Sequence, residues 1–429
     1  MKGHQHYQEA MLSVEEALDR ILSLCTPLNA EQKTILQAFG HVLGEDVISS
    51  MNVPQLDNSA MDGYAVQAKS LVGASKSSPV SLDVVGNVAA GQIPDAVVRS
   101  GTAVRIMTGA PLPLGADAVV PFEDTDEGFP ECSNVGGNRI AIFTQIDSAN
   151  YVRAAGRDIK RGEQVFKKGT LLRSSHVGVL ASLGIDAVKI VRSPRVAILA
   201  TGDELVEPGE ELTPGRIYNS NSFGIASAVV RSGGEPRILG IASDNIETLS
   251  AKIDEGLTSD LLITSAGVSK GDYDIVKDVL AKRGRMEFWS VRMRPAKPLA
   301  FGTLISSDGR DVPHLGLPGN PVSALVAFEQ FGRPAILKMM GKTDLERPTI
   351  EAVLEDPIYN GDGRRVYARV VVTKGNGIYY AKLTGHQDSN LLSSMAKANG
   401  LAICPEENRV KDVGEVVKVQ MIDWPEGVF

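Results

Sequence analysis

Residues 195–205, RVAILATGDEL, decide the fold of the central part of this chain. The apolar run at 196–200 predicts a strand buried on both faces, because no polar side chain interrupts it. Further along, buried-strand patterns such as DLLITSAG (260–267) alternate with amphipathic helix patterns such as NIETLSAKIDEGL (245–257). This alternation predicts a parallel sheet covered by helices on both faces, which is a three-layer α/β domain.

The regions on either side of this domain differ in character. Residues 51–150 are rich in Val, Gly, Pro and Ser and contain short alternating runs, which predict a small β module. Short strand patterns return after Gly341, as in RRVYARVVVTK (364–374), and predict a second β module. Near the start of the chain, we expect a helix that is capped by Ser13, followed by a second short helix at 31–39.

The composition is that of an ordinary globular protein. The 429 residues are 43% hydrophobic and 22% charged, with a formal charge of -8, which argues against broad nucleic-acid binding. The three cysteines lie outside any CxxC pattern, which excludes a zinc ribbon and fits a reducing compartment. Neither a signal-peptide core nor a run of about 18 apolar residues is present. We therefore expect a cytoplasmic protein that binds neither nucleic acid nor membrane.

Two adjacent acids, Asp203 and Glu204, follow the first strand at the edge where parallel sheets bind ligands. Such a pair can hold a hard divalent cation such as magnesium, although a solvated acidic turn is the simpler alternative. The next polar segment, NSNS at 219–222, has two interpretations. Asn219 and Ser220 either face a polar ligand or cap the helix that begins there.

The segment TSAGVSKGDYD (264–274) follows another strand and begins a helix. Its small hydroxyl and glycine residues predict a phosphate cradle, because amides at a helix N-terminus point at the anion. Asp272 and Asp274 lie beside this cradle, which makes sense if a cation bridges them to the phosphate. The alternative is a helix that is simply capped by Asp272.

Two more segments could line a site. VRMRPAKPLAFG (291–302) concentrates three cations, Arg292, Arg294 and Lys297, in a segment that two prolines stiffen. Such a basic segment suits an oxyanion, or else it is a surface loop paired with acids. In GLPGNPVSAL (316–325), Pro318 and Pro321 stiffen a turn that either walls a pocket or only joins a strand to a helix. Asn320 is the candidate N-cap of that helix.

Together, these loops resemble the molybdopterin molybdenumtransferase family, which performs the last step of molybdenum cofactor synthesis and includes the C-terminal part of gephyrin. DNSAMDGYA combined with GADAVVP and LPGNP is specific to that family. The matching stretches follow one order along most of the chain: DNSAMDGYA (57–65), RIMTGAPLPLGADAVVPFED (105–124), RAAGRDIKRGE (153–163), ATGDEL (200–205), IYNSNS (217–222), GVSKGDYD (267–274), MRPAKP (293–298) and GLPGNPVSAL (316–325).

The resemblance implies a multidomain α/β plus β fold. Its parts would be a helical and extended N-terminal linker domain (1–50 plus 151–192), an inserted β module (51–150), an α/β molybdopterin-binding domain (193–342) and a C-terminal β-barrel-like domain (343–429). It also implies a homodimer, in which the inserted module of one subunit lies near the sheet domain of the other. Transient contact with molybdopterin adenylyltransferase and with cofactor-accepting enzymes would follow.

The implied reaction inserts molybdate into adenylylated molybdopterin, with magnesium, and releases AMP. By matching motifs, the resemblance assigns catalytic roles to Asp62, Asp158, Glu204 and Asp274. It assigns magnesium to Asp203, Glu204, Asp272 and Asp274. It assigns substrate binding to Thr264, Ser265, Gly267, Ser269, Arg292, Arg294, Lys297, Pro318, Pro321, Asn219 and Ser220.

Three residues depart from the family pattern. Ala266 and Ala296 replace glycines, and Lys270 adds a cation beside the acids, changes that could tune affinity or select tungstate over molybdate. Two alternatives therefore stay open, a tungstate-inserting homologue and a non-catalytic molybdopterin-binding scaffold. A related enzyme that adenylylates molybdopterin is a third alternative, which leaves the additional modules unexplained.

Overall fold

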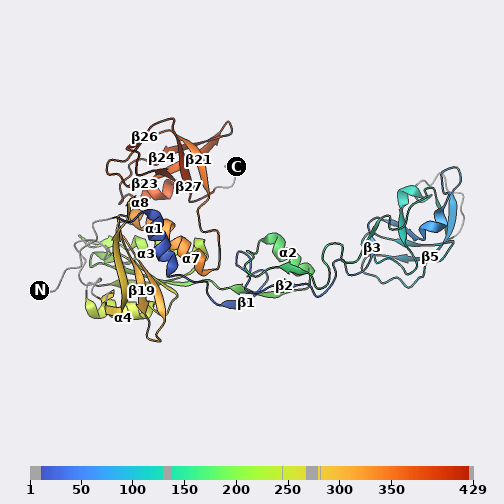
Figure 1. Ribbon diagram of the computed structural model, residues 1–429, viewed down its shortest axis with the longest axis horizontal. Coiled ribbons are helices and arrows are strands. Elements are labelled where there is room, and N and C mark those ends of the chain that lie inside the picture. Colours follow the sequence, from blue (N-terminus) through green and yellow to red (C-terminus); the bar gives the residue numbers. More distant parts are fainter. Residues whose placement is uncertain (1–10, 129–137, 244, 267–278, 281, 425–429) are drawn as a thin grey trace. The chain divides into compact units, whose positions relative to one another are not determined.

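The computed structural model describes residues 11–128, 138–243, 245–266, 279–280 and 282–424 (Figure 1). The chain forms two compact units, each with its own core. One unit combines Met1–Glu31 with Val191–Phe429, and the other is Gln32–Ile190.

The first unit contains a six-stranded sheet whose order is β15-β12-β16-β20-β19-β17. Four of these strands are parallel: β15 (Glu235–Ala242), β12 (Arg195–Thr201), β16 (Leu261–Ser265) and β20 (Asp311–Leu317). The other two, β19 (Pro298–Ile305) and β17 (Gly284–Ser290), are antiparallel. The parallel arrangement predicted from the sequence is confirmed for these four strands, and β19 and β17 make the sheet as a whole mixed. Only residues 306–310 join β19 to β20, a connection that is too short for a parallel crossover.

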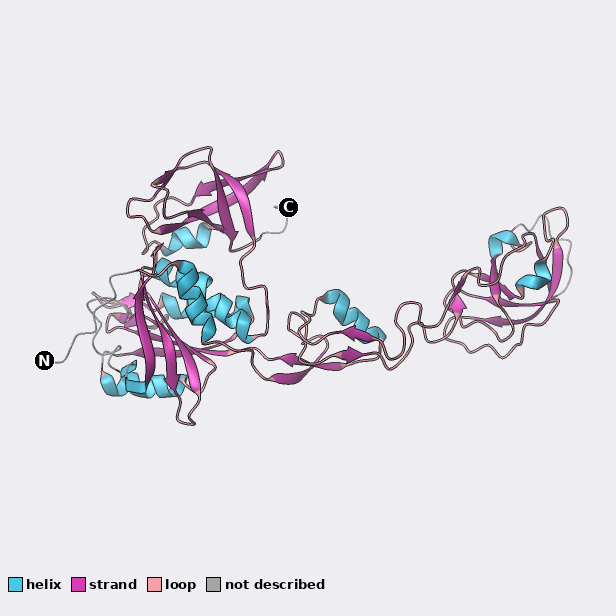
Figure 2. Ribbon diagram, in the orientation of Figure 1, coloured by secondary structure: helices cyan, strands magenta, loops and turns pink. Residues whose placement is uncertain are grey.

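Helices cover both faces of this sheet (Figure 2). Along β12, Val196 and Ile198 face one core, and Ala197 and Leu199 face the other, because successive side chains point to opposite faces. The first core includes α3 (Ser220–Ser232), α6 (Pro321–Ala327), α7 (Arg333–Met339) and α1 (Val14–Ser23). The second core includes α4 (Ile246–Gly256). The predicted three-layer domain is thus confirmed.

The N-terminal helix begins where the sequence predicts. The Ser13 side chain accepts a hydrogen bond of 3.0 Å from the Glu16 backbone amide, which caps α1. The helix that was expected from Asp274 onward lies mostly outside the described residues.

The C-terminal part of the same unit is a closed five-stranded β-barrel (Figure 1). It closes because β23 pairs with both β24 and β25. Its strands are β21 (Thr349–Leu354), β23 (Arg365–Gly375), β24 (Ile378–Leu383), β25 (Gly400–Cys404) and β27 (Val416–Met421). Smaller elements accompany it, namely α8 (Leu392–Lys397), the β22–β26 pair (Ile358–Tyr359 and Val410–Lys411) and β18 (Met293–Arg294), which pairs with β23. The predicted barrel-like fold is confirmed.

The second unit is mostly β structure. Its main sheet has the order β7-β4-β6-β5-β8: Ala118–Pro121, Gly63–Val66, Thr102–Ile106, Val80–Val88 and Arg139–Ile142. Two 3-10 turns accompany this sheet, η1 (Ala68–Leu71) and η2 (Phe122–Asp124). Three two-stranded pairs and one helix complete the unit: β1–β11 (Ala30–Thr34 and Ala187–Val191), β2–β10 (Val47–Ile48 and Gln164–Phe166), β3–β9 (Asn58–Ser59 and Val152–Arg153) and α2 (Ser174–Ser182).

The prediction of a short helix at 31–39 is wrong. Ala30–Thr34 is instead strand β1, which pairs with β11, a strand far along the chain. This tertiary pairing overrides the local helical pattern, since neighbouring strands can satisfy backbone groups that no nearby residue reaches. No helix in the described residues has the length and apolar character to cross a membrane.

A buried carboxylate ties the barrel to the sheet domain. Glu329 lies in η4 (Phe328–Gly332), one turn of π-helix, and is only 4% exposed. It accepts hydrogen bonds from Arg231 and, at 2.9 Å, from Nε of Arg347. Both arginines also donate to the Ile422 carbonyl, at 3.3 and 3.4 Å. Arg231 lies on α3, whereas Arg347 precedes β21 and Ile422 follows β27, so the cluster joins the two folds.

A buried histidine lies in the middle of the sheet. Nε2 of His314, on β20, lies 3.1 Å from Oγ1 of Thr264, on β16, and both residues are buried. Burial lowers the pKa of His314 to about 3, because the apolar surroundings disfavour the imidazolium. His314 is therefore neutral near pH 7.

The Glu329 cluster predicts a large loss of stability on Glu329→Gln. The substitution leaves two arginines without their carboxylate, which should lower the free energy of unfolding by about 3 kcal/mol. Urea denaturation measures this loss. The control is Glu235→Gln, because its 3.9 Å pair with Arg195 is largely exposed and should contribute little. Equal losses in the two variants would contradict the prediction.

The low pKa of His314 predicts an acid-dependent loss of stability. Unfolded histidine titrates near pH 6.5, so between about pH 6.5 and 3 the unfolded chain binds a proton that the native chain does not. Stability is complete above this window and falls with pH inside it, by about 2 kcal/mol at about pH 5 from this residue alone. Urea denaturation at several pH values should show that His314→Gln weakens this dependence. An identical dependence in both proteins would exclude His314 as its source.

Candidate functional site

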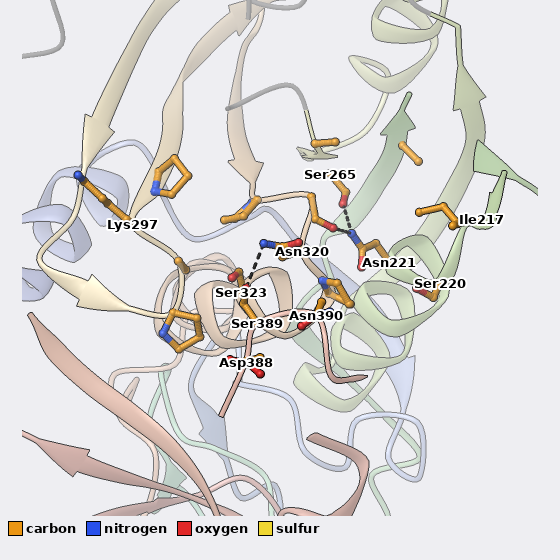
Figure 3. A pocket seen from close by; sticks show the side chains of 18 of the residues that line it. Ile217, Ser220, Asn221, Ser265, Lys297, Asn320, Ser323, Asp388, Ser389 and Asn390 are labelled. Atoms are coloured by element: carbon orange, nitrogen blue, oxygen red, sulfur yellow. Dashed lines mark hydrogen bonds between the residues drawn. The ribbon is translucent and has the colours of Figure 1, made fainter. Parts of the chain in front are cut away.

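A pocket of about 840 Å³ opens at the carboxyl ends of β12, β16 and β20 (Figure 3). Its walls come from the sheet domain and from the C-terminal barrel of the same unit. Open α/β sheets bind ligands at this edge. Eight of the predicted site residues converge on it: Glu204, Asn219, Ser220, Ser265, Arg294, Lys297, Pro318 and Pro321.

The turn after β20 is held by two asparagines (Figure 3). Nδ2 of Asn221 donates to Oγ of Ser265 at 2.8 Å and to the Gly319 carbonyl at 2.7 Å. Asn320 does not make the predicted N-cap bond with its side chain, since its Nδ2 donates instead to Oγ of Ser389 at 3.0 Å. The turn is therefore fixed both to the sheet and to the barrel, which keeps this wall of the pocket rigid.

Asn219 caps the helix that follows it, as one of the two interpretations of NSNS expected. Its side chain accepts a hydrogen bond of 3.2 Å from the Ser222 amide, which caps α3. Its Nδ2 donates to Glu207 at 3.2 Å, so both ends of the amide have partners. The residue also lines the pocket, where its main contribution is to fix the N-terminus of α3.

The pocket contains charges of both signs. Arg294, Lys297 and Arg364 supply positive charge, whereas Glu204 and Asp388 supply negative charge. Arg364 is oriented by its neighbours, because its Nε donates to Asp362 at 2.9 Å and its Nη1 to the Met293 carbonyl at 3.2 Å. The hydrogen bond from Arg364 lowers the pKa of Asp362. Cations in such surroundings can bind phosphate or another oxyanion.

The approach of Glu204 to the backbone depends on Gly202. The φ angle of Gly202 is 141°, and a Cβ at this position would lie 2.5 and 2.7 Å from the two Glu204 carboxylate oxygens. Only glycine accommodates that contact without displacing the carboxylate. Among the residues that the structure describes, no three acidic, histidine or cysteine side chains group as metal ligands.

Other predicted residues lie away from the pocket lining. Thr264 is buried against His314, while Arg292 and Asp203 are exposed outside the lining. Four more lie outside the described residues: Gly267, Ser269, Asp272 and Asp274.

Asp62 and Asp158 belong to the second unit. The Asp62 carboxylate accepts hydrogen bonds from the Thr108 amide at 2.6 Å and the Thr108 hydroxyl at 2.8 Å. These bonds lower the pKa of Asp62. Asp158 is exposed on the loop that follows β9. The Asp57 carboxylate accepts a 2.7 Å bond from the Ala155 amide, which joins the loops that carry the two acids.

Sequence reasoning missed the barrel side of the pocket. Gln387, Asp388, Ser389 and Asn390 line it together with Arg364. Polar residues gathered in GHQDSN (385–390) after a strand were a usable signal. Their approach to the sheet domain, however, is a tertiary contact between segments far apart in the sequence.

The two alanines that depart from the family pattern both line this pocket. Their φ angles are 76° for Ala266 and 75° for Ala296, in the left-handed region. In this region the backbone of an L-residue with a Cβ is less stable by roughly 1–2 kcal/mol, which explains why glycine is favoured at such positions. Each alanine therefore adds a methyl group to the pocket at a cost in backbone strain.

Family models match the chain in three segments. A model described as "MoeA N-terminal region (domain I and II)" matches residues 12–184. One described as "Probable molybdopterin binding domain" matches residues 197–338. A third, "MoeA C-terminal region (domain IV)", matches residues 351–422.

Similar proteins match over nearly the whole length. Molybdopterin molybdenumtransferase 2 of Mycobacterium tuberculosis is 36% identical, with 96% of this chain and 100% of that protein covered. The molybdopterin molybdenumtransferase of Nostoc sp. is 36% identical, with 93% and 91% covered. The crystal structure of a molybdopterin biosynthesis MoeA protein from Pyrococcus horikoshii superposes with a TM-score of 0.82 at 31% identity, covering 97% of this chain and 100% of that one. The chain therefore belongs to the molybdopterin molybdenumtransferase family.

Proposed function

We propose that this protein inserts molybdate into adenylylated molybdopterin and releases AMP, which yields the molybdenum cofactor. The observation that carries the proposal is the convergence of Arg294, Lys297 and Arg364 around one pocket at the ligand-binding edge of the sheet. Both substrates carry oxyanion groups, which such cations bind. The names of the relatives in Mycobacterium tuberculosis and Nostoc support the same reaction.

The pocket offers different surfaces to the parts of this substrate. Arg294 and Lys297 bind and neutralise the oxyanions, and Ser265 and Ser220 offer hydroxyl donors to the pterin phosphate. Pro318 and Pro321 provide a stiff apolar wall for the pterin ring. Asn219 positions the amides at the start of α3. We assign Gly267, Ser269 and Arg292 to the same substrate from their motifs. Thr264, which was expected to bind it too, is buried against His314 and is not given this role.

Magnesium fits the donor chemistry of this edge. Glu204 presents carboxylate oxygens in the pocket, and carboxylate oxygens are the protein ligands that magnesium prefers. We propose that Asp203, Glu204, Asp272 and Asp274 hold the ion. When bound, magnesium would offset the charge of the phosphates and polarise the bond that is cleaved. Glu204 and Asp274 would in addition orient the reacting phosphate.

We assign the other two catalytic acids, Asp62 and Asp158, to the molybdate end of the site. The hydrogen bonds from Thr108 favour the ionised form of Asp62, so its carboxylate is ready to accept hydrogen bonds or to bind a cation. We propose a homodimer in which these acids serve the pocket of the partner subunit.

The proposal extends to the organisation and the surroundings of the protein. We propose domain boundaries at 1–50 plus 151–192, 51–150, 193–342 and 343–429. We also propose that the protein acts in the cytoplasm, where it would receive its substrate from molybdopterin adenylyltransferase and pass its product to cofactor-accepting enzymes.

Removing one pocket cation should slow AMP release. Lys297→Ala deletes a charge-assisted contact to an oxyanion, so kcat/KM for adenylylated molybdopterin should fall by roughly 10–100-fold. AMP release is measured with magnesium and molybdate. The control in the same assay is Lys418→Ala, which removes an exposed lysine of the barrel. An undiminished rate in Lys297→Ala, while the control is also normal, would remove Lys297 from the site.

Chelation of magnesium should abolish AMP release without unfolding the protein. We expect activity to disappear with EDTA and to return when excess magnesium is added, because the ion, held by the acids assigned to it, would offset the charge of the phosphates. The melting temperature provides the control for folding. Full AMP release in EDTA would contradict the magnesium assignment. The same assay with tungstate in place of molybdate compares AMP release with the two oxyanions.

A further inference from the structure

Arg369 is an unusual buried cation. It lies on β23 and is only 1% exposed. Its guanidinium donates to three backbone carbonyls, those of Gln387 (3.0 Å), His386 (3.4 Å) and Asp388 (3.0 Å). Its Nε donates to Oγ of Ser394 at 3.1 Å. A charge buried mainly against neutral carbonyls is costly, so its retention calls for an explanation beyond stability.

The carbonyls that Arg369 binds belong to the loop that forms the barrel wall of the pocket. The loop residues 387–390 line the pocket. Arg369 does not line it, but instead lines a smaller cavity of about 120 Å³. The backbone amide of Arg369 also donates to Oε1 of Gln387 at 2.8 Å, and Nε2 of Gln387 donates to the Arg369 carbonyl at 3.3 Å. The main chain and the side chain of Arg369 therefore both hold the loop.

The same loop is held from the sheet domain as well. Ser389 accepts a 3.0 Å hydrogen bond from Asn320 at its hydroxyl and a 3.1 Å bond from the Val322 amide at its carbonyl. Asn320 and Val322 belong to the turn and helix that follow β20. The loop thus lies between two anchors, and the charged guanidinium of Arg369 forms the anchor on the barrel side.

We propose that Arg369 is a positioning residue, which sets the conformation of residues 386–390 and through them the fit of the ligand in the pocket. Its planar fork has donors in fixed directions, which matches three carbonyls of one tight loop, whereas a lysine ammonium lacks that geometry. Burial lowers the pKa of Arg369 to about 10, which leaves it charged near pH 7. The identity of the ligand rests on the proposed function, whereas the role of Arg369 in holding residues 386–390 does not.

The first test measures the loop itself. Hydrogen–deuterium exchange should show faster exchange of the amides of residues 386–390 in Arg369→Lys than in the wild type. The matched control is Arg192→Lys, because Arg192 is also partly buried and donates to the Ser193 carbonyl at 3.2 Å and to Asp260, away from the pocket. Unchanged exchange of the loop in folded Arg369→Lys would overturn the inference, whether or not the protein releases AMP.

The second test separates positioning from general stability. With saturating molybdate and magnesium, the KM for adenylylated molybdopterin should rise about tenfold in Arg369→Lys, with kcat changed by less than about threefold, since looser binding of the ground state raises KM. The control, Arg192→Lys, should leave KM unchanged. An equal rise in both variants would reduce Arg369 to a structural role and overturn the inference. Absence of AMP release from the wild type would instead refute the proposed function.

A milder variant covers the case in which Arg369→Lys does not fold. Ser394→Ala keeps the guanidinium and removes one hydroxyl, which accepts from Nε of Arg369 and donates to the Leu391 carbonyl at 2.6 Å. We expect faster loop exchange here too, and a rise in KM of about threefold. A normal loop and a normal KM in Ser394→Ala, combined with failure of Arg369→Lys to fold, would assign the arginine to stability alone.

Discussion

The carboxylate of Glu329 is the constraint on which the pocket depends. It pairs with Arg231 of the sheet domain and with Arg347 at the entrance to the barrel, and both arginines share the Ile422 carbonyl. Because the pocket has walls from both folds, its shape follows from how they dock. A buried ion pair adds little net stability over apolar packing. Its hydrogen bonds are directional, however, so this cluster fixes the angle at which the barrel docks on the sheet domain.

The burial of the sheet on both faces determines where chemistry can occur. Polar side chains inside it must find partners there, as Thr264 does with His314. The sheet therefore offers groups to a ligand at the carboxyl ends of its strands and in the segments that follow them, where Ser265, Glu204 and Pro318 line the pocket. This explains why motifs distant in the sequence converge, and why Thr264, although part of such a motif, does not join them.

Rigidity and strain are combined around the pocket. The pocket walls are held by side chains that donate hydrogen bonds to backbone carbonyls or serine hydroxyls, namely those of Asn221, Asn320 and Arg369. These bonds preorganise the surface before a ligand binds. The left-handed backbone at Ala266 and Ala296 can persist only in such a fixed frame. The surroundings hold these two strained residues in place, and their methyl groups reach the ligand space.

The sequence by itself determined the succession of modules and the sheet side of the pocket. Apolar runs, helix periods and the loops after strands are local patterns, so Ser13, Glu204 and Lys297 could be placed without coordinates. Tertiary structure alone decided that 30–34 is a strand and that GHQDSN faces the sheet domain. Both features depend on contacts between residues far apart in the chain, and such contacts leave no periodic trace in the sequence.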